Sequence, residues 1–271
     1  MNIQSLKKHA LNMRRNIVEM VYTAQSGHPG GSLGCADILA YLYLEEMNIN
    51  KKNVSSTNRD RFVLSKGHCS PALYAALKEA KLLDEDIHTF RQLHSKLQGH
   101  PNMNYIEGVD MSTGSLGQGI STAVGMAIAN KLDNNKNRVY VLVGDGESEE
   151  GLVWEAMMAG AHYKLDNLCV IFDVNKLQID GNVIDVIGPL PLDSKAKAFG
   201  FNVVKANGND FESLEKAFNE ARNCKGKPTC IVASTTTGKG VSFMENNYAW
   251  HGAAPNKEQY VQAMKDLKEA K

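Results

Sequence analysis

Two apolar segments joined by a helical pattern occupy the middle of the chain. Residues 139–143 are apolar and largely β-branched, and they end at a Gly-Asp-Gly turn centred on Asp145, which predicts a buried strand. Residues 152–165 repeat apolar positions at steps of three and four and predict a helix, and residues 168–172 predict a second buried strand. Such a unit is a right-handed βαβ crossover with parallel strands. Asp145 and Asn175 should therefore meet at one edge of the sheet.

The same patterns extend over the rest of the chain. They predict helices at 6–24, 36–47, 84–93, 120–132 and 211–223, a helix from a Ser70 cap to about 83, a short helix near 193–199 and a tail helix from about 256. They predict strands at 61–64, 201–205 and 229–234, glycine-rich loops at 26–34 and 111–119, and an irregular stretch at 176–192. With 271 residues, 43% of them hydrophobic, the chain can bury one large α/β core or two small ones, and we expect one domain, 1–271.

Composition narrows the range of functions. Thirty basic and thirty acidic residues give a formal net charge of zero without a long charged run, which argues against nucleic-acid binding. No apolar run is long enough to span a bilayer, and the polar N-terminus does not look like a signal peptide, so we expect a cytoplasmic protein. The five cysteines show no CxxC pairing and are interpreted as small hydrophobic residues.

Asp145 and Asn175 predict a cation site. Carboxylate and amide oxygens suit a hard divalent ion such as Mg²⁺, which keeps water and substrate phosphates in its other positions. The helix expected after Gly146 would add amide donors and a positive dipole end, both favourable to a diphosphate. The alternative is an ordinary βα turn with an ordinary cap at Asn175. A second glycine-rich loop, 111–119, leads into a helix and is either an anion cradle or a close-packing device.

The eight histidines fall into two groups. His9, His88, His94 and His162 lie in helical patterns and are interpreted as surface or structural residues. His28, His68, His100 and His251 each adjoin a glycine in a predicted loop. Imidazoles in such loops suit proton transfer and hydrogen bonding to sugar hydroxyls, because their pKa lies near neutrality.

Longer strings carry a resemblance to a known family. GDG, the following helix and the asparagine after the next strand resemble the thiamine-diphosphate signature, and GDGESEEG…FDVNKLQIDG is similar to transketolases in particular. SGHPGGSLG, SKGHCSPALY, LQGHPN, TGSLGQG and WHG resemble transketolase segments in the same order. Glu147 stands where many members have a small residue or cysteine. Ser115 stands where many members have proline. The resemblance implies a three-layer α/β/α thiamine-diphosphate-binding fold with a mainly parallel sheet.

The resemblance also implies roles for individual residues. By carry-over, Asp145, the Asn175 side chain and the Leu177 carbonyl hold the metal, Mg²⁺ or alternatively Ca²⁺ or Mn²⁺. The expected cofactor contacts are His68, Gly114, Ser115, Leu116, Gly146, Glu150, Asn175 and His251. His28, His100 and His251 would face the ketose donor, and Glu150 would link the two cofactor sites of a dimer.

The resemblance does not extend to the later domains of transketolases, and this predicts a companion chain. In transketolases the glutamate that generates the reactive ylid, the pyrimidine pocket and the arginines for the sugar phosphate belong to later domains. We therefore expect the N-terminal subunit of a two-chain transketolase that moves a two-carbon ketol unit between ketose and aldose phosphates, in an α2β2 assembly. The alternatives are another thiamine-diphosphate enzyme, either similar to deoxyxylulose-phosphate synthase or a transketolase of modified sugars, and a non-catalytic binding module of the same fold.

Overall fold

A five-stranded parallel sheet forms the centre of the molecule. The computed structural model describes residues 1–269. The strands are β1 (Arg61–Leu64), β2 (Val139–Gly144), β3 (Leu168–Val174), β6 (Asn202–Asn207) and β7 (Thr229–Ser234). Their order across the sheet is β1-β2-β3-β7-β6, and every neighbouring pair is parallel. The parallel βαβ unit predicted from residues 139–172 is confirmed.

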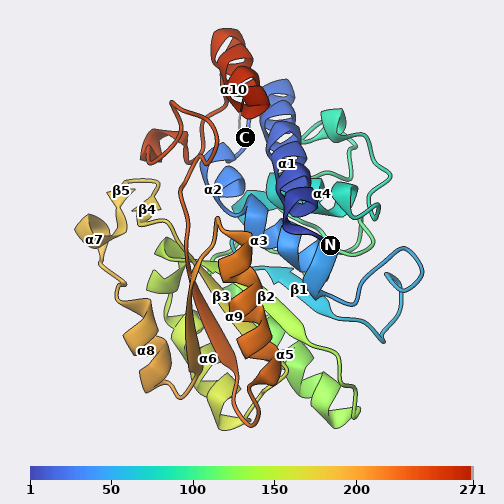
Figure 1. Ribbon diagram of the computed structural model, residues 1–271, viewed down its shortest axis with the longest axis vertical. Helices are drawn as coiled ribbons and strands as arrows, with labels where there is room; N and C mark the ends of the chain where they lie inside the picture. The colour runs from blue at the N-terminus through green and yellow to red at the C-terminus, as the bar shows by residue number, and fades with distance from the viewer. Residues whose placement is uncertain (270–271) are drawn as a thin grey trace.

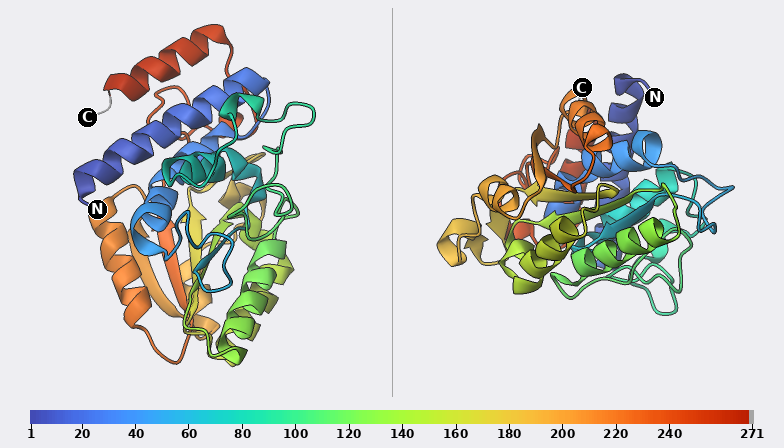
Figure 2. Two further views of the ribbon diagram at one scale, coloured as in Figure 1. Left: turned by 90° about the vertical axis from the view of Figure 1, so that its right-hand side faces the viewer. Right: turned by 90° about the horizontal axis from the view of Figure 1, so that it is seen from below.

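Helices pack on both faces of this sheet (Figures 1 and 2). Val141 and Val143 point into a core shared with α5 (Gln118–Leu132), α6 (Gly151–His162) and α8 (Leu192–Ala198). Tyr140 and Leu142 belong to the core on the other face. That core includes residues of α1 (Ile3–Ala24), α3 (Ala36–Tyr41), α4 (Ser70–Glu79) and α9 (Phe211–Asn223). The alternation along β2 produces the predicted three-layer α/β/α architecture, because successive side chains of a strand face opposite sides.

The tail helix α10 (Lys257–Glu269) lies beside α1, beyond one end of the sheet (Figure 1). Ala263 and Leu267 are buried, and the ring of Tyr260 stacks on Tyr22 with centroids 4.1 Å apart. The predicted tail helix is therefore confirmed.

The loop predicted at 26–34 is partly helical. Residues Pro29–Gly34 form α2, with Pro29 in the first turn, and all six are buried. Proline is well tolerated at this position because the first amide of a helix needs no partner. The helix predicted at 36–47 is α3 continued by a π-helical turn, Leu42–Glu46.

The helix predicted at 84–93 is wrong. Only a 3-10 turn, Ile87–Thr89, forms there, and both Arg91 and His94 adopt positive φ angles of 58° and 64° that a right-handed helix cannot contain. The preceding helix, α4, also ends earlier than predicted, at Glu79. Its cap residue is Cys69, and the Ser70 hydroxyl instead donates to the carbonyl of Gly99, 2.8 Å away.

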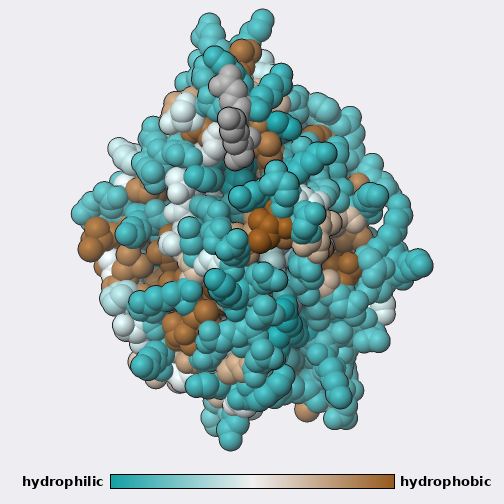
Figure 3. All heavy atoms as spheres, in the orientation of Figure 1, coloured by the Kyte–Doolittle hydropathy of each residue, from teal (hydrophilic) through white to brown (hydrophobic). Residues whose placement is uncertain are grey.

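The stretch predicted to be irregular, 176–192, contains a small hairpin of β4 (Leu177–Gln178) and β5 (Gly181–Asn182), followed by a helical turn, α7 (Val183–Val186). Four apolar side chains in and around this segment are exposed: Ile179, Ile184, Val186 and Ile187. Figure 3 shows hydrophobic residues on the side of the molecule where α7 and α8 lie.

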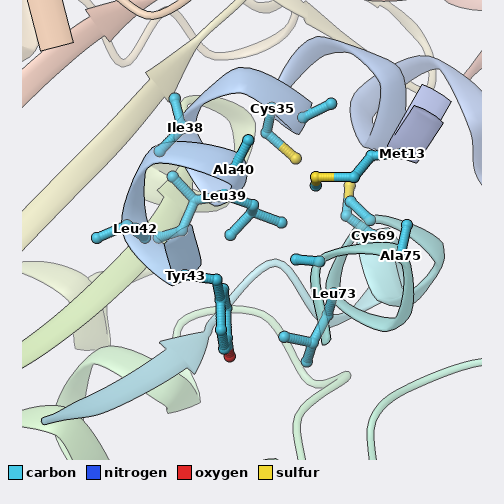
Figure 4. Packing of buried hydrophobic residues seen from close by; sticks show 14 of the residues in the cluster. Met13, Cys35, Ile38, Leu39, Ala40, Leu42, Tyr43, Cys69, Leu73 and Ala75 are labelled. Atoms are coloured by element: carbon cyan, nitrogen blue, oxygen red, sulfur yellow. The ribbon is translucent and has the colours of Figure 1, made fainter. Parts of the chain in front are cut away.

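All five cysteines are free thiols, and four of them are buried. Figure 4 shows Cys35 and Cys69 beside Met13 in the core between α1, α3 and α4. Their burial agrees with the interpretation of the cysteines as small hydrophobic residues.

Candidate active site

A cavity of about 420 Å³ opens at the carboxyl ends of β2 and β3. Ten of the residues singled out from the sequence line it: His28, His68, Gly114, Leu116, Asp145, Gly146, Glu150, Asn175, Leu177 and His251. Ser115 is exposed beside it, and His100 lies behind it, with its ring packed against Gly114. Segments from six separate parts of the chain therefore converge at one edge of the parallel sheet, where α/β proteins usually bind ligands.

Asp145 lies at the floor of this cavity. It directly follows β2, it is 2% exposed, and its Oδ1 accepts a hydrogen bond of 2.9 Å from the amide of Gly146. Its Oδ2 accepts one of 2.5 Å from the amide of Lys176, the residue after Asn175. Burial, reinforced by the charge of Asp173, raises the pKa of Asp145 to about 6. The predicted meeting of Asp145 with the Asn175 segment is therefore present.

The helix expected to begin after Gly146 starts differently. A 3-10 turn, Gly146–Glu149, comes first, and α6 begins at Gly151. The amide of Gly146 is occupied by the Asp145 carboxylate, while Glu150 is exposed at the rim of the cavity. In the second glycine-rich loop, a Cβ on Gly119 would lie 2.7 Å from Cα of Ser65, so glycine at this position permits close packing of α5.

The four loop histidines form one cluster. The ring centroids of His68 lie 5.3 Å from His28 and 5.1 Å from His251, and the centroids of His28 and His251 are 5.6 Å apart. His100 is further out, at 6.3 Å from His28. Burial and the neighbouring His68 lower the pKa of both His28 and His251 to about 4. The two rings are therefore neutral at pH 7 and can donate and accept hydrogen bonds.

The other histidines lie away from this cluster. His9 contacts Glu79 and His88 contacts Asp86, as expected of structural or surface residues. His94 is not helical, because the chain turns there with a positive φ.

These lowered pKa values make stability depend on pH. Between about pH 6.5 and 4 the unfolded chain takes up protons at His28 and His251 while the folded chain does not, so the free energy of unfolding should fall as the pH falls through this window. We expect a loss on the order of 1 to 2 kcal/mol after allowance for the solvent that reaches both rings. Urea unfolding at pH 7 and pH 4.5 should show a larger loss for wild type than for the double variant His28→Asn/His251→Asn. Equal losses would contradict the assignment.

Glu147 is a structural residue that sequence reasoning did not assign. It is 3% exposed, and its carboxylate joins three segments. Oε1 accepts from the Ser65 hydroxyl at 2.5 Å and the Gly117 amide at 2.9 Å, and Oε2 accepts from the Gly144 amide at 3.0 Å. Burial raises the pKa of this carboxyl, and the three hydrogen bonds oppose that effect. Glu147 thus fixes the Gly114–Gly117 loop against the ends of β1 and β2.

Replacement of Glu147 by glutamine should destabilise the chain by about 1 to 3 kcal/mol, because an amide cannot accept from all three donors and leaves one buried group unpaired. Urea unfolding measures the change, and amide hydrogen exchange at Gly117 should accelerate. Glu155→Gln on the exposed side of α6 is the control and should change the free energy of unfolding by less than about 0.5 kcal/mol. Equal effects of the two substitutions would count against this role.

A buried ion pair whose lysine lines the cavity was also not predicted from the sequence. Nζ of Lys66 lies 2.5 Å from Oδ2 of Asp173, and the two side chains are 2% and 0% exposed. The Thr235 hydroxyl donates to the other oxygen of Asp173. Although burial opposes the charged form, Asp173 holds the pKa of Lys66 well above its ordinary value. The sequence feature that could have indicated this pair is an aspartate within the otherwise apolar strand 168–174, since a buried charge needs a partner.

The fold and cavity define an α/β protein with a cavity at the carboxyl edge of its parallel sheet, where proteins of this class usually bind ligands. Comparison with known sequences identifies one family. The family described as "Transketolase, thiamine diphosphate binding domain" matches residues 6–268, and the chain belongs to this family. No helix in the described part of the chain has the length and apolarity needed to cross a membrane.

Two bacterial relatives have nearly the same length. An apulose-4-phosphate transketolase subunit of Phocaeicola vulgatus is 40% identical over 270 residues, which cover 99% of this chain and 96% of that protein. The 6-deoxy-6-sulfo-D-fructose transketolase subunit SqwG of a Clostridium species is 40% identical over 266 residues, 96% of this chain and 95% of that protein.

A solved structure shows the same fold. The transketolase of Campylobacter jejuni superposes with a TM-score of 0.91 at 39% identity over 99% of this chain. The match covers only 43% of that longer protein. The predicted family and fold class are confirmed, and the chain corresponds to the thiamine diphosphate binding part of a transketolase.

Proposed function

We propose that this chain is the diphosphate- and cation-binding subunit of a two-chain transketolase that transfers a two-carbon ketol unit between ketose and aldose phosphates. The observation that carries the proposal is the convergence of the Asp145 and Asn175 segments and a cluster of neutral histidines on one cavity. Thiamine diphosphate, when bound, supplies the carbon centre that accepts and releases the ketol unit.

The residues at the cavity floor suit a hard cation. Asp145 offers a buried carboxylate, Asn175 a side-chain oxygen and Leu177 a backbone carbonyl, a donor set that favours Mg²⁺ and also accommodates Ca²⁺ or Mn²⁺. A positive ion would offset the burial that raises the pKa of Asp145. Within residues 1–269 no three His, Cys, Asp or Glu side chains gather as a metal site, so this mixed oxygen set is the proposed one.

The remaining residues divide between the cofactor and the sugar. His68, Gly146 and the loop Gly114–Leu116 line the cavity or its rim and would contact the cofactor. His28, His100 and His251 would bind the hydroxyl groups of the ketose and move protons at them, since neutral imidazoles carry both a donor and an acceptor. The exposed Glu150 would link this site to that of a second copy.

A companion chain would complete the site. Relatives of the same length are named as transketolase subunits, and the apolar side chains of Ile179 and Val186 next to the cavity are exposed, as is typical of a surface that another protein covers. We infer that the companion provides the pyrimidine pocket and the activating glutamate, in an α2β2 assembly with the cofactors at chain interfaces. The free thiols of the chain suit a reducing compartment, and the proposed location is the cytoplasm.

The test is reconstitution. The companion is identified by co-purification from the native source and mass determination, and the pair is assayed for ketol transfer with a panel of ketose phosphates and sulfonated ketoses. The panel includes apulose 4-phosphate and 6-deoxy-6-sulfofructose, because relatives are named for these sugars. We expect turnover by the pair and none by the chain alone. Robust turnover by the chain alone would overturn the two-chain proposal, and inactivity with every companion would favour a non-catalytic binding module.

A further inference from the structure

Arg91 lies behind the histidine cluster and is not among the residues proposed to contact the cation, the cofactor or the sugar. It lines a second cavity, of about 370 Å³, that His100 also lines. Its Nη1 donates to the Ser26 hydroxyl at 2.8 Å, and its Nη2 donates to the Gly99 carbonyl at a long 3.5 Å. Among the described residues no carboxylate pairs with this guanidinium. The cation is thus held by neutral oxygens from two loops.

The two loops are those that carry active-site histidines. Ser26 precedes His28 by two residues, and Gly99 directly precedes His100. The Gly99 carbonyl also accepts a hydrogen bond of 2.8 Å from the Ser70 hydroxyl, two residues after His68. A single carbonyl and a single guanidinium therefore connect the backbone segments of three histidines.

Close packing fixes the guanidinium in this place. A Cβ on Gly99 would lie 2.7 Å from both Cζ and Nε of Arg91, so only glycine leaves room for the side chain. Cζ lies 5.6 Å from the centroid of the Phe90 ring, and the positive φ of Arg91 directs the chain back towards the loops. The Arg91 amide closes its own loop by donating to the Leu97 carbonyl at 2.9 Å.

We propose that Arg91 is a positioning residue whose guanidinium ties the segment leading to His28 to the segment leading to His100 and so sets the spacing of the sugar-facing histidines. The inference rests on the proposed function, since that function assigns binding of the sugar to these two histidines.

The charge of Arg91 has a second effect, on the pKa values of these histidines. Burial first and then Arg91 lower the pKa of His100, and burial, His68, His251 and Arg91 lower that of His28, while Cys69 opposes both shifts. Arg91 thereby favours neutral rings.

The experiment follows histidine ring signals by NMR from pH 5 to 8 in the full chain, without any turnover. Arg91→Gln removes the charge, whereas Arg91→Lys keeps the charge but loses the two-pronged geometry. Gln92→Ala is the control, because Gln92 lines the same cavity. We expect the pKa of His100 to rise towards its ordinary value in Arg91→Gln and to stay lowered in Arg91→Lys. The ring signals of both His28 and His100 should shift in both Arg91 variants and remain in place in Gln92→Ala.

A second readout uses the reconstituted pair. Arg91→Gln should lower kcat about tenfold with a smaller change in KM, and Arg91→Lys should recover part of the loss, because displaced catalytic groups slow the reaction more than they weaken binding. The proposal is overturned if the histidine signals and titration of Arg91→Gln match those of Gln92→Ala. Failure of the proposed function would instead abolish wild-type turnover and leave the NMR result unchanged, so the two failures can be told apart.

Discussion

Replacement of Asp145 by asparagine should weaken the cation-dependent binding of thiamine diphosphate by at least about a hundredfold. The substitution keeps the shape of the side chain but removes the negative charge that faces the proposed cation, and changes even to residues that only orient metal ligands typically weaken metal binding 10- to 100-fold. Calorimetric titration of thiamine diphosphate into the chain with its companion, in the presence of Mg²⁺, measures the change.

Two controls make this measurement specific. Asp180 also lines the cavity but is exposed, and Asp180→Asn should leave the affinity nearly unchanged. When the cation is chelated, wild type and Asp145→Asn should bind the cofactor equally weakly, since the lost interaction is with the cation. An unchanged affinity of Asp145→Asn in Mg²⁺ would show that this carboxylate is no ligand.

Replacement of Lys66 by methionine should lower the free energy of unfolding by about 3 to 5 kcal/mol. The substitution leaves Asp173 buried, charged and without its cation, and breaking one side of a buried ion pair costs about this much. Urea unfolding of the isolated chain measures the effect without a contribution from the cofactor. For a chain of ordinary stability this is a large fraction of the total.

The double variant Lys66→Met/Asp173→Leu separates the ion pair from the packing. It removes both charges and should recover most of the lost stability, because a buried pair replaced by apolar residues is often nearly neutral. Lys51→Met, which breaks a pair whose side chains are 70% and 86% exposed, should change the free energy of unfolding by less than about 1 kcal/mol. A double variant as unstable as Lys66→Met would contradict the assignment.

The local sequence pattern was sufficient to predict helices and strands where burial follows a regular period. The helix at 211–223 and the strand at 229–234 have the predicted bounds, because Asp210 caps the helix and the strand is apolar on both faces. Parallel pairing then brings Asp145 to the Asn175 segment, so the location of the cavity followed from two short stretches of sequence. The grouping of His28, His68 and His251 came from their positions next to glycines in predicted loops, which motif resemblance then sharpened, and not from any local period.

Contacts between distant segments could not be predicted in this way. Lys66 and Asp173 are 107 positions apart, and the sequence around each residue does not indicate which residue it pairs with. Residues 84–93 have apolar spacing compatible with a helix, but the chain turns at Arg91, whose side chain reaches back to Ser26, 65 positions away. Tertiary contacts outweighed helix propensity there, as they often do in short segments.

The most direct test of the proposed site is a crystal structure of the chain with its companion, thiamine diphosphate and Mn²⁺, with the metal located by its anomalous scattering. We predict one ion within about 2.3 Å of the Asp145 carboxylate, the Asn175 side-chain oxygen and the Leu177 carbonyl, bridging to the diphosphate. A diphosphate bound elsewhere, or an ion that contacts none of these three residues, would contradict the proposal.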